Sequence, residues 1–582
     1  MLKVSRIQNH QSNTPKKVLP KTVQKDFAGN VPLMTGKTIR NLLSSGLQKA
    51  EGFMLYLMGV NPNTEPDDIE ESKIEESEDE VFKNKLSTFK GVIEEIQALQ
   101  SIWYLADWDN QTHAMPAKAN EYRAWQMSIL KQMIQKVLIS DEMSSLLEYL
   151  TDEAVFNKLN DIDKAQVKDI HKQNQMYKKV SPEVIQELFE TTTVAHSVWA
   201  QARDLNKFDL LVPYLEKIVS LKQQIAEMVG YKNSPYEVLL DFYEPGMTTQ
   251  VLDKLFGELK KDLLPIIQAI NKSPKKNDNS YLQRQLSPSA HIEIAKLVSE
   301  HVGFDLSRGR IGAAAQPFSN LIAPDDVVLA TGTYKDLWNP IGTPIHEAGH
   351  GLYNLAIDRN LSKTTLYDCS SYGIHESQAR LYEAIIGQGL PFWKSLYPKL
   401  QEKFPEYYKS ISLEKFYEAI NFVEPFNQVD EVTYNMHAIL RYEIERDLIE
   451  GRIQVKNLPK IWDKKMKEYF GVVSPEDAHG VLQDGHWSSG DFGYFPSYAL
   501  GTLYSIQFYN QAKKEIPDLE GEIAKGNMLP LKNWLGEKIH KYGKLQTPDE
   551  IIQRVTGKRI EHKQFIDYIK EKYGKLYAIS NW

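Results

Sequence analysis

Cysteine is almost absent from this chain of 582 residues, because Cys369 is the single one. One thiol excludes an internal disulfide framework and a metal cluster held by several cysteines. Ligands for a metal must therefore come from histidine, aspartate and glutamate. The scarcity of cysteine also suits a reducing compartment, so a cytoplasmic location is the expectation.

The chain also lacks a strong excess of either charge and a long apolar run. Its 69 lysine and arginine residues stand against 77 aspartate and glutamate residues, a formal charge of -8, which gives no reason to expect nucleic acid as a partner. The best apolar stretch, residues 52–60 (GFMLYLMGV), is about half as long as a membrane span. We therefore expect no membrane partner, while 42% apolar residues are ample for a large core.

The first eighty residues differ from the rest. Residues 1–25 carry six basic residues and no acid, which is weakly typical of an organelle-targeting leader and more typical of a solvated tail. Residues 65–80 hold ten acids in sixteen positions, the composition of a flexible linker. No fixed repeat or linker divides the remainder. We predict an N-terminal extension over residues 1–81 and one helical domain over residues 82–582.

Strand-like sequence is scarce, whereas helix signals are frequent. Apolar residues recur at helical spacing, as at Leu252, Leu255, Phe256, Leu259 and Leu263. A hydroxyl residue before proline and acids predicts helix starts at Ser181, Ser474 and Thr547, and Gly557 can end the helix that Thr547 opens with a capping box. The best strand is residues 326–331 (DVVLAT), which we predict to be an exposed edge strand that pairs with an extended peptide. The predicted fold class is mainly α, with one large helical body and a small sheet beside the site.

The strongest chemical signal is residues 346–350 (HEAGH). Residues four apart share a face of a helix, so His346 and His350 can reach one zinc ion, while Glu347 lies beside them. Zinc acidifies a bound water and polarises a carbonyl, which requires neutral histidine ligands and a neighbouring carboxylate as base. The motif alone is moderately specific, because two histidines exposed on the surface of a helix can produce the same five-residue pattern without a metal.

A third ligand makes the site complete. A catalytic zinc takes two histidines and a carboxylate and keeps one position open. Glu376, in residues 375–378 (HESQ), follows His350 by 26 residues and opens a second helical run. Most glutamates at such places are solvated, so this assignment depends on the motif before it. Zn²⁺ is the expected cofactor, and another divalent transition metal such as Co²⁺ would suit the same ligands.

Several segments together resemble the thermostable carboxypeptidase (carboxypeptidase Taq) family of metallopeptidases. They are residues 346–350 (HEAGH), 375–378 (HESQ), 480–487 (GVLQDGHW), 108–112 (WDNQT), 243–249 (YEPGMTT) and 430–435 (DEVTYN). The resemblance covers roughly residues 82–582 and implies a nearly all-helical body with a long, deep cleft, similar to the angiotensin-converting-enzyme and neurolysin group. It also implies a homodimer that removes C-terminal residues from peptides, with zinc on His346, His350 and Glu376 and with Glu347 as base and proton shuttle.

Residues 483–498 (QDGHWSSGDFGYFPSY) are dense in groups suited to the wall of an active site. A positioned histidine or tyrosine can donate a hydrogen bond to the oxyanion of a tetrahedral intermediate. We assign this role to His486 and Tyr498, with Tyr494 in reserve. Buried tyrosines also pack and bond for purely structural reasons, which is an equally common use.

Three departures from the family fall on basic positions of its cleft. Gln316 stands where the family has histidine, and Val328 stands where it has arginine. The loop from Phe426 to Val429 is three residues short and has no arginine. Arginine is suited to bidentate binding of a free carboxylate. Its absence leaves open which residue anchors the C-terminus of a substrate. Arg308 and Arg310 are candidate substitutes, although solvated loop charges are the commoner use of such residues.

The leading hypothesis is thus a zinc metallocarboxypeptidase that acts on peptides. One alternative is a metallopeptidase with reduced dependence on the free C-terminal carboxylate. Another is a catalytically silent peptide-binding homologue, which is disfavoured because all four residues of the metal chemistry are present. Residue preference, the physiological substrate and the role of residues 1–81 do not follow from the sequence.

Overall fold

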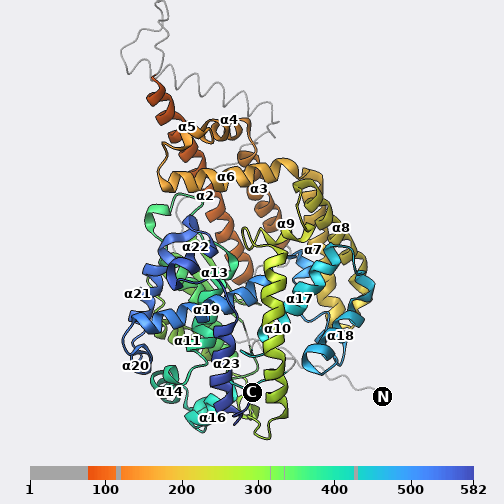
Figure 1. Ribbon diagram of the computed structural model, residues 1–582, viewed down its shortest axis with the longest axis vertical. Helices are drawn as coiled ribbons and strands as arrows, with labels where there is room; N and C mark the ends of the chain where they lie inside the picture. The colour runs from red at the N-terminus through yellow and green to blue at the C-terminus, as the bar shows by residue number, and fades with distance from the viewer. Residues whose placement is uncertain (1–76, 113–118, 315, 333, 425–429) are drawn as a thin grey trace, which may run out of the picture. The chain divides into compact units, whose positions relative to one another are not determined.

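Helices dominate the computed structural model, which describes residues 77–582 apart from 113–118, 315, 333 and 425–429 (Figure 1). Before the sheet lie α2 (Glu78–Thr112), α3 (Asn120–Leu138), α4 (Asp141–Leu150), α5 (Glu153–Phe156), α6 (Asp161–Lys179), α7 (Pro182–Asp204), α8 (Val212–Val229), α9 (Pro235–Leu240), α10 (Thr249–Lys272) and α11 (Pro288–His301). After it lie α12 (Asn339–Leu355), α13 (Tyr372–Arg380), α14 (Leu390–Lys403), α15 (Pro405–Tyr408), α16 (Leu413–Ile420), α17 (Tyr434–Ile449), α18 (Leu458–Phe470), α19 (Phe495–Glu515), α20 (Leu519–Ala524), α21 (Leu529–Lys538), α22 (Pro548–Thr556) and α23 (Lys563–Leu576). The predicted mainly helical class is confirmed.

Helix α2 begins inside the acidic run that suggested a linker. Its first turn holds Glu78, Asp79 and Glu80, and the carboxylate of Glu80 accepts the backbone N–H of Ser77 at 3.2 Å. Negative charge is stabilising at a helix N-terminus because it faces the positive end of the helix dipole. The helical part therefore begins at residue 78, four residues before the predicted boundary. The basic residues 1–25, and the part of the acidic run up to residue 76, lie outside the described residues.

Two of the three predicted helix starts are confirmed. The Ser181 side chain accepts the N–H of Val184 at the start of α7, and Thr547 forms a capping box at the start of α22, which ends at Gly557 with φ of 72°. The prediction at Ser474 is wrong, because only a short 3₁₀ turn, η7 (Asp477–His479), follows it. Gly480 ends that turn with non-helical angles (φ -121°, ψ -116°), so the segment after Ser474 is too short to form an α-helix.

The predicted apolar stripe on α10 is confirmed, since the five residues named for it are all buried in the main core. That core joins α7 and all later helices down to α23. A smaller cluster, built around Phe89, Ile93 and Met143, holds α2 against α3, α4 and α6. Apolar burial of this extent is the main term that stabilises a helical body.

The small sheet contains β1 (Gly309–Ala313), β2 (Phe318–Ala323) and β3 (Asp326–Thr331) in the order β1-β3-β2. The bounds predicted for β3 are confirmed, but its predicted place at an exposed edge is wrong. β1 pairs with β3 in parallel and β2 pairs with it antiparallel, so both edges of β3 are occupied. Its side chains from Val327 onward are buried between α12 and the C-terminal end of α2, and no free backbone edge remains on β3 for a substrate.

None of the helices in the part of the chain that the structure describes is both long and apolar enough to cross a membrane.

Candidate metal centre

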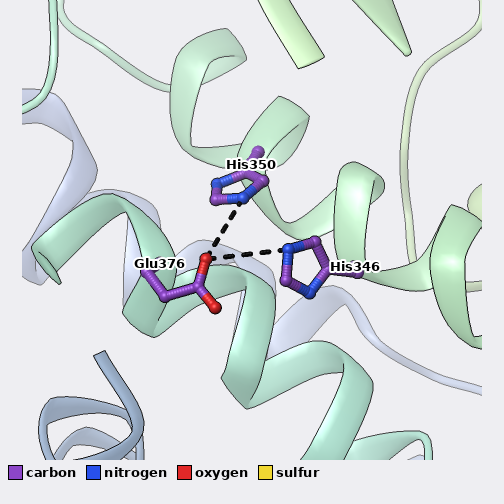
Figure 2. A group of neighbouring side chains, drawn as sticks. All are labelled: His346, His350 and Glu376. Atoms are coloured by element: carbon purple, nitrogen blue, oxygen red, sulfur yellow. Dashed lines mark ion pairs between the residues drawn. The ribbon is translucent and has the colours of Figure 1, made fainter. Parts of the chain in front are cut away.

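Helix α12 presents the two histidines of the HEAGH segment from consecutive turns. Pro340 occupies the first turn of α12, where the lack of an N–H costs nothing, and most of the helix is buried. His346 and His350 are four residues apart and project from the same face, as Figure 2 shows. Their Nε2 atoms both point toward Glu376.

Glu376 reaches the histidines from α13. Its Oε2 lies 3.6 Å from Nε2 of His346 and 3.6 Å from Nε2 of His350 (Figure 2). One ligand atom from each of the three residues lies within 4.8 Å of the others, so a single ion can contact all three. The structure thus brings together the three residues that were predicted as ligands. The donor set of two imidazole nitrogens and one carboxylate oxygen fits a divalent transition metal with an open coordination position.

Two glycines let the backbones approach closely enough for this geometry. A Cβ on Gly349 would lie 2.7 Å from Cα of Ala379 and from the carbonyl oxygen of Gln378, so α12 and α13 touch there. A Cβ on Gly501 would lie 2.5 Å from Cγ of Glu376, so α19 presses directly on the ligand side chain. Any larger residue at either position would push Glu376 away from the histidines.

Residues behind the ligands hold them in place, and sequence reasoning missed them. His346 Nδ1 lies 2.9 Å from Oε2 of Glu383, in the π-helical turn η5 (Leu381–Ile386), and Arg380 donates to the same oxygen at 2.8 Å. A histidine that ligates through Nε2 needs such a partner at Nδ1 to set its tautomer and ring orientation. Tyr434 donates its hydroxyl to Oε1 of Glu376 at 3.0 Å, which leaves Oε2 to face the histidines. The one hint in the sequence was that Glu383 follows Glu376 by seven residues, about two helical turns.

Glu347, the predicted base, is buried beside the predicted ligands. Burial raises its pKa to about 7, with His346 acting in the opposite direction and Glu376 in the same direction as burial. A carboxyl with a pKa near neutrality can both accept and return a proton at physiological pH. The position of Glu347 is therefore consistent with the role predicted for it.

His486, Tyr494 and Tyr498 contact one another. Nε2 of His486 is 3.3 Å from the hydroxyl of Tyr498, and the rings of Tyr494 and Tyr498 lie 4.9 Å apart. Asp484 contacts Nδ1 of His486 at 3.1 Å and is itself held by Arg441 at 2.8 Å. Burial has the largest single influence on the pKa of His486 and lowers it, but the hydrogen bond and charge of Asp484 together with the charge of Asp491 raise that pKa above its ordinary value. Burial raises the pKa of both tyrosines well above 10, so both keep a proton to donate.

Two buried glutamates, also missed from the sequence, tie these elements together. Glu244 accepts the N–H of Gly373 at 2.5 Å and the hydroxyl of Ser497 at 2.6 Å, and so joins the start of α13 to the start of α19. Glu445 accepts hydrogen bonds from the hydroxyl of Tyr236, the indole N–H of Trp487 and the backbone N–H of Gly493. These bonds fix the loop that carries His486. The segment 243–249 stood out in the sequence, but nothing local indicated which helices its glutamate would join.

The cations proposed as substitutes for the missing arginines are already paired. Arg308 donates to Asp325 at 2.5 Å and to the carbonyl of Leu355 at 2.8 Å. Arg310 pairs with Asp326 at 3.0 Å on the surface. Val328 is fully buried in the sheet, Gln316 is exposed, and the loop from Phe426 to Val429 lies outside the described residues.

Comparison with known proteins assigns this arrangement to a family. The model of the carboxypeptidase Taq (M32) metallopeptidases matches residues 88–573. The chain belongs to this family. It is therefore a metal-dependent peptidase of the carboxypeptidase type, which confirms the resemblance found in the sequence.

Relatives and solved structures agree with the assignment. Carboxypeptidase 1 of Bacillus subtilis is 36% identical over 82% of this chain and 95% of its own length. Thermostable carboxypeptidase 1 of Pyrococcus furiosus is 33% identical over 85% of this chain and 100% of its own. The crystal structure of the M32 carboxypeptidase of Deinococcus radiodurans R1 superposes with a TM-score of 0.81 at 29% identity, over 85% of this chain and 100% of that one.

Proposed function

We propose that this member of the M32 family is a zinc carboxypeptidase whose metal is held by His346, His350 and Glu376. The observation that carries the proposal is the convergence of three ligand atoms within 4.8 Å, two of them from a single helix face. Zinc suits two imidazoles and a carboxylate, and Co²⁺ would satisfy the same donors. A metal bound there supplies Lewis acidity at the carbonyl to be cleaved.

Glu347 acts as the general base in this proposal. Its carboxylate takes the proton of the attacking water at an oxygen atom and later returns a proton to the nitrogen of the leaving amine. Its buried position and its pKa of about 7 support both transfers, since neither protonation state is strongly disfavoured near neutral pH.

His486 and Tyr498 stabilise the oxyanion that develops as the water adds, and Tyr494 supports Tyr498 through ring contact. Tyr498 keeps its proton at neutral pH because burial raises its pKa well above 10, and the neighbouring acids raise the pKa of His486 and so favour the protonated ring that can donate from Nε2. Asp484 orients the imidazole of His486 through Nδ1, so that Nε2 faces the site. Donors fixed before the reaction are effective because no reorganisation is needed when charge appears.

A second candidate function differs only in how the substrate is recognised. Val328 and Gln316 replace the family's basic residues, and Arg308 and Arg310 are engaged by acids. These observations favour weakened dependence on the free C-terminal carboxylate without any change to the metal chemistry. The four residues of that chemistry are all present, which argues against a silent binding protein.

Mass spectrometry of the products from a mixed peptide pool tests the proposed function. We expect fragments that lack one residue at a time from the C-terminus, complete loss of cleavage in a chelator and recovery on addition of Zn²⁺. Internal fragments as the main products, or cleavage that continues in the chelator, would contradict it. We also propose, from family membership, that the chain forms a homodimer, which light scattering after size exclusion would report as twice the chain mass.

A further inference from the structure

A second cavity lies apart from the residues of the proposed chemistry. Its volume is about 520 Å³, and it is lined by residues of α14, α16, α19, α20 and α23 (Figure 1 shows these helices). None of the metal ligands, Glu347 and His486 lines it. Ligand pockets of roughly 300–1,000 Å³ hold small organic molecules. The cavity is therefore large enough for a ligand that is not the substrate of the metal centre.

The floor of this cavity carries the buried ammonium group of Lys572, on α23. The Lys572 side chain is 8% exposed, and its Nζ donates to Oε2 of Glu431 at 2.6 Å and to the hydroxyl of Tyr568 at 3.3 Å. An ammonium group has three N–H donors. No third hydrogen-bond partner of Nζ occurs among the described residues, so one donor remains for a ligand.

Two tyrosine hydroxyls add further donors beside Lys572. Tyr417 and Tyr509 line the cavity, and neither hydroxyl forms a hydrogen bond within the described part of the chain. Both are close enough to Tyr568 for their charges to raise its pKa, after burial and Glu431. Burial raises the pKa of Tyr417 to about 12 and also raises that of Tyr509, so both keep their protons. Ammonium and phenol donors together suit a carboxylate.

The rim of the cavity has acids and apolar surface in addition to lysines. Each lysine of the rim is paired with an acid, in Lys275–Glu418 at 2.9 Å, Lys513–Glu520 at 3.8 Å and Lys575–Glu571 at 3.0 Å. Glu414 also lines the cavity and forms no ion pair with the described residues, while Leu390, 37% exposed, supplies apolar surface. A simple anion would be repelled by these acids, whereas a zwitterion with an apolar side chain matches all three kinds of group.

Buried charges connect the cavity floor to a metal ligand. Burial lowers the pKa of Lys572, the carboxylate of Glu431 opposes this, and the charge of Arg380 lowers that pKa further, so the three groups are neighbours. Nη1 of Arg380 donates to Oε2 of Glu383 at 2.8 Å, and that oxygen lies 2.9 Å from Nδ1 of His346. A change of charge at Lys572 can therefore act on the groups that orient His346.

We propose that this cavity is a regulatory site for a free amino acid with an apolar side chain. Lys572, Tyr417 and Tyr509 hold its carboxylate, Glu414 holds its ammonium group, and Leu390 contacts its side chain. A carboxylate on Lys572 weakens the attraction of that lysine for Glu431. Glu431 then attracts Arg380 more strongly, Arg380 holds Glu383 less firmly, and turnover falls. The regulation rests on the proposed carboxypeptidase function, which releases free amino acids, whereas the binding does not depend on it.

Isothermal titration of the full-length, zinc-loaded protein with L-leucine tests the binding. The double variant Tyr417→Phe, Tyr509→Phe removes two hydroxyls that bond to no described residue, so the fold should persist. We expect its Kd for L-leucine to be at least about tenfold higher than that of wild type, because hydrogen bonds to a charged group contribute that much. Tyr214→Phe is the matched control, since Tyr214 lies on α8 and does not line the cavity.

Two analogues of leucine test the zwitterion. 4-Methylpentanoate lacks the ammonium group and 3-methylbutylamine lacks the carboxylate, and each should bind wild type at least about tenfold more weakly than L-leucine. An analogue that binds as tightly as L-leucine would overturn the ligand assignment. A Kd for L-leucine that is equal in wild type, Tyr214→Phe and the double variant would overturn the site.

Steady-state kinetics separates regulation from product inhibition. Leucine that competes with the peptide at the metal centre raises KM alone, whereas leucine in the cavity should lower kcat at saturating peptide by roughly fivefold or more. We expect this fall in wild type and Tyr214→Phe but not in the double variant. An unchanged kcat in wild type would overturn the regulatory role. If no peptide is cleaved by any of these proteins while the difference in Kd persists, the carboxypeptidase function fails and the binding site stands.

Discussion

At the scale of single residues, the proposed metal centre has three side chains that would hold the ion and one side chain that would move a proton. His346 bonds to Glu383 and Glu376 bonds to Tyr434, whereas no hydrogen bond between the described residues joins Glu347 to either of these partners. Removing the base should therefore leave the ligand set intact.

Replacing Glu347 by glutamine should abolish nearly all turnover without loss of the metal. The amide cannot accept a proton from the attacking water, and a general base of this kind contributes roughly 10²- to 10⁴-fold to the rate. Metal analysis and kcat of Glu347→Gln, measured on the same preparation, check the prediction. A variant that retains wild-type turnover would remove Glu347 from the mechanism.

Recognition of the C-terminus should be weak for a carboxypeptidase. A charge-assisted bond to a carboxylate contributes about 1.5 to 3 kcal/mol, and Val328 cannot supply one. We expect a free-acid peptide to be cleaved less than about tenfold faster than its C-terminal amide.

Arg308 and Arg310 provide the control for this comparison. Both are paired with acids, so Arg308→Ala and Arg310→Ala should leave the ratio of acid to amide unchanged. A wild-type ratio of roughly a hundredfold that persists in both variants would mean that another cation anchors the carboxylate and that the inference from the missing arginines is wrong.

At the scale of helices and strands, Glu244 is the side chain that locks α13 to α19. Burial raises its pKa from 4.5 to about 7, and the hydrogen bonds from Ser497 and Gly373 lower it by less. Between these two values the folded protein holds a proton that the unfolded chain has released. The contribution of this group to stability is thus fully present below about pH 4.5 and is lost as the pH rises through 7.

Glu244→Gln should remove this pH dependence. Its amide oxygen can still accept the N–H of Gly373 and the hydroxyl of Ser497. The free energy of unfolding of the variant relative to wild type should increase by on the order of 2 kcal/mol from pH 5 to pH 8. Denaturant unfolding at both pH values measures it, with the exposed Glu520→Gln as control. A difference that does not change with pH would show that Glu244 is not protonated in the folded protein.

Local features of these elements followed from the sequence, whereas their partners did not. The caps at Ser181 and Thr547 depend on a few neighbouring residues, and the HEAGH spacing places two histidines on one helix face by geometry alone. The bounds of β3 were likewise predictable from its apolar, β-branched composition. Its central place in the sheet was not, because β1 contains two glycines and β2 is mixed in polarity, so neither strand has a clear pattern. The roles of Glu383, Tyr434 and Glu244 depend on contacts between segments that are distant in the sequence, so they could be assigned only from the structure.

At the scale of the whole molecule, the chain separates into residues 1–76 and a compact unit from residue 77 to residue 582. The family match lies entirely within the second unit. Every residue assigned to the chemistry lies there as well.

Deleting residues 1–76 should leave kcat and KM unchanged. Ser77 should remain, because its backbone and side chain form the first hydrogen bonds of α2 with Glu80. Steady-state kinetics and thermal unfolding of the truncated and full chains provide the comparison. An inactive or unfolded truncated protein would show that the first unit contributes to the site or to the stability of the body.

The most direct test of the central claim is the metal content of single-ligand variants. Wild type should bind one Zn²⁺ per chain after dialysis, as measured by mass spectrometry of the element, and His350→Ala and Glu376→Ala should each bind far less. The matched control is His375→Gln, whose ring stacks on His350 at 4.3 Å but bonds to Asn354 and is not assigned as a ligand. We predict that it keeps one Zn²⁺ per chain. Full metal content in His350→Ala or Glu376→Ala, with loss in His375→Gln, would contradict the assignment of the metal centre.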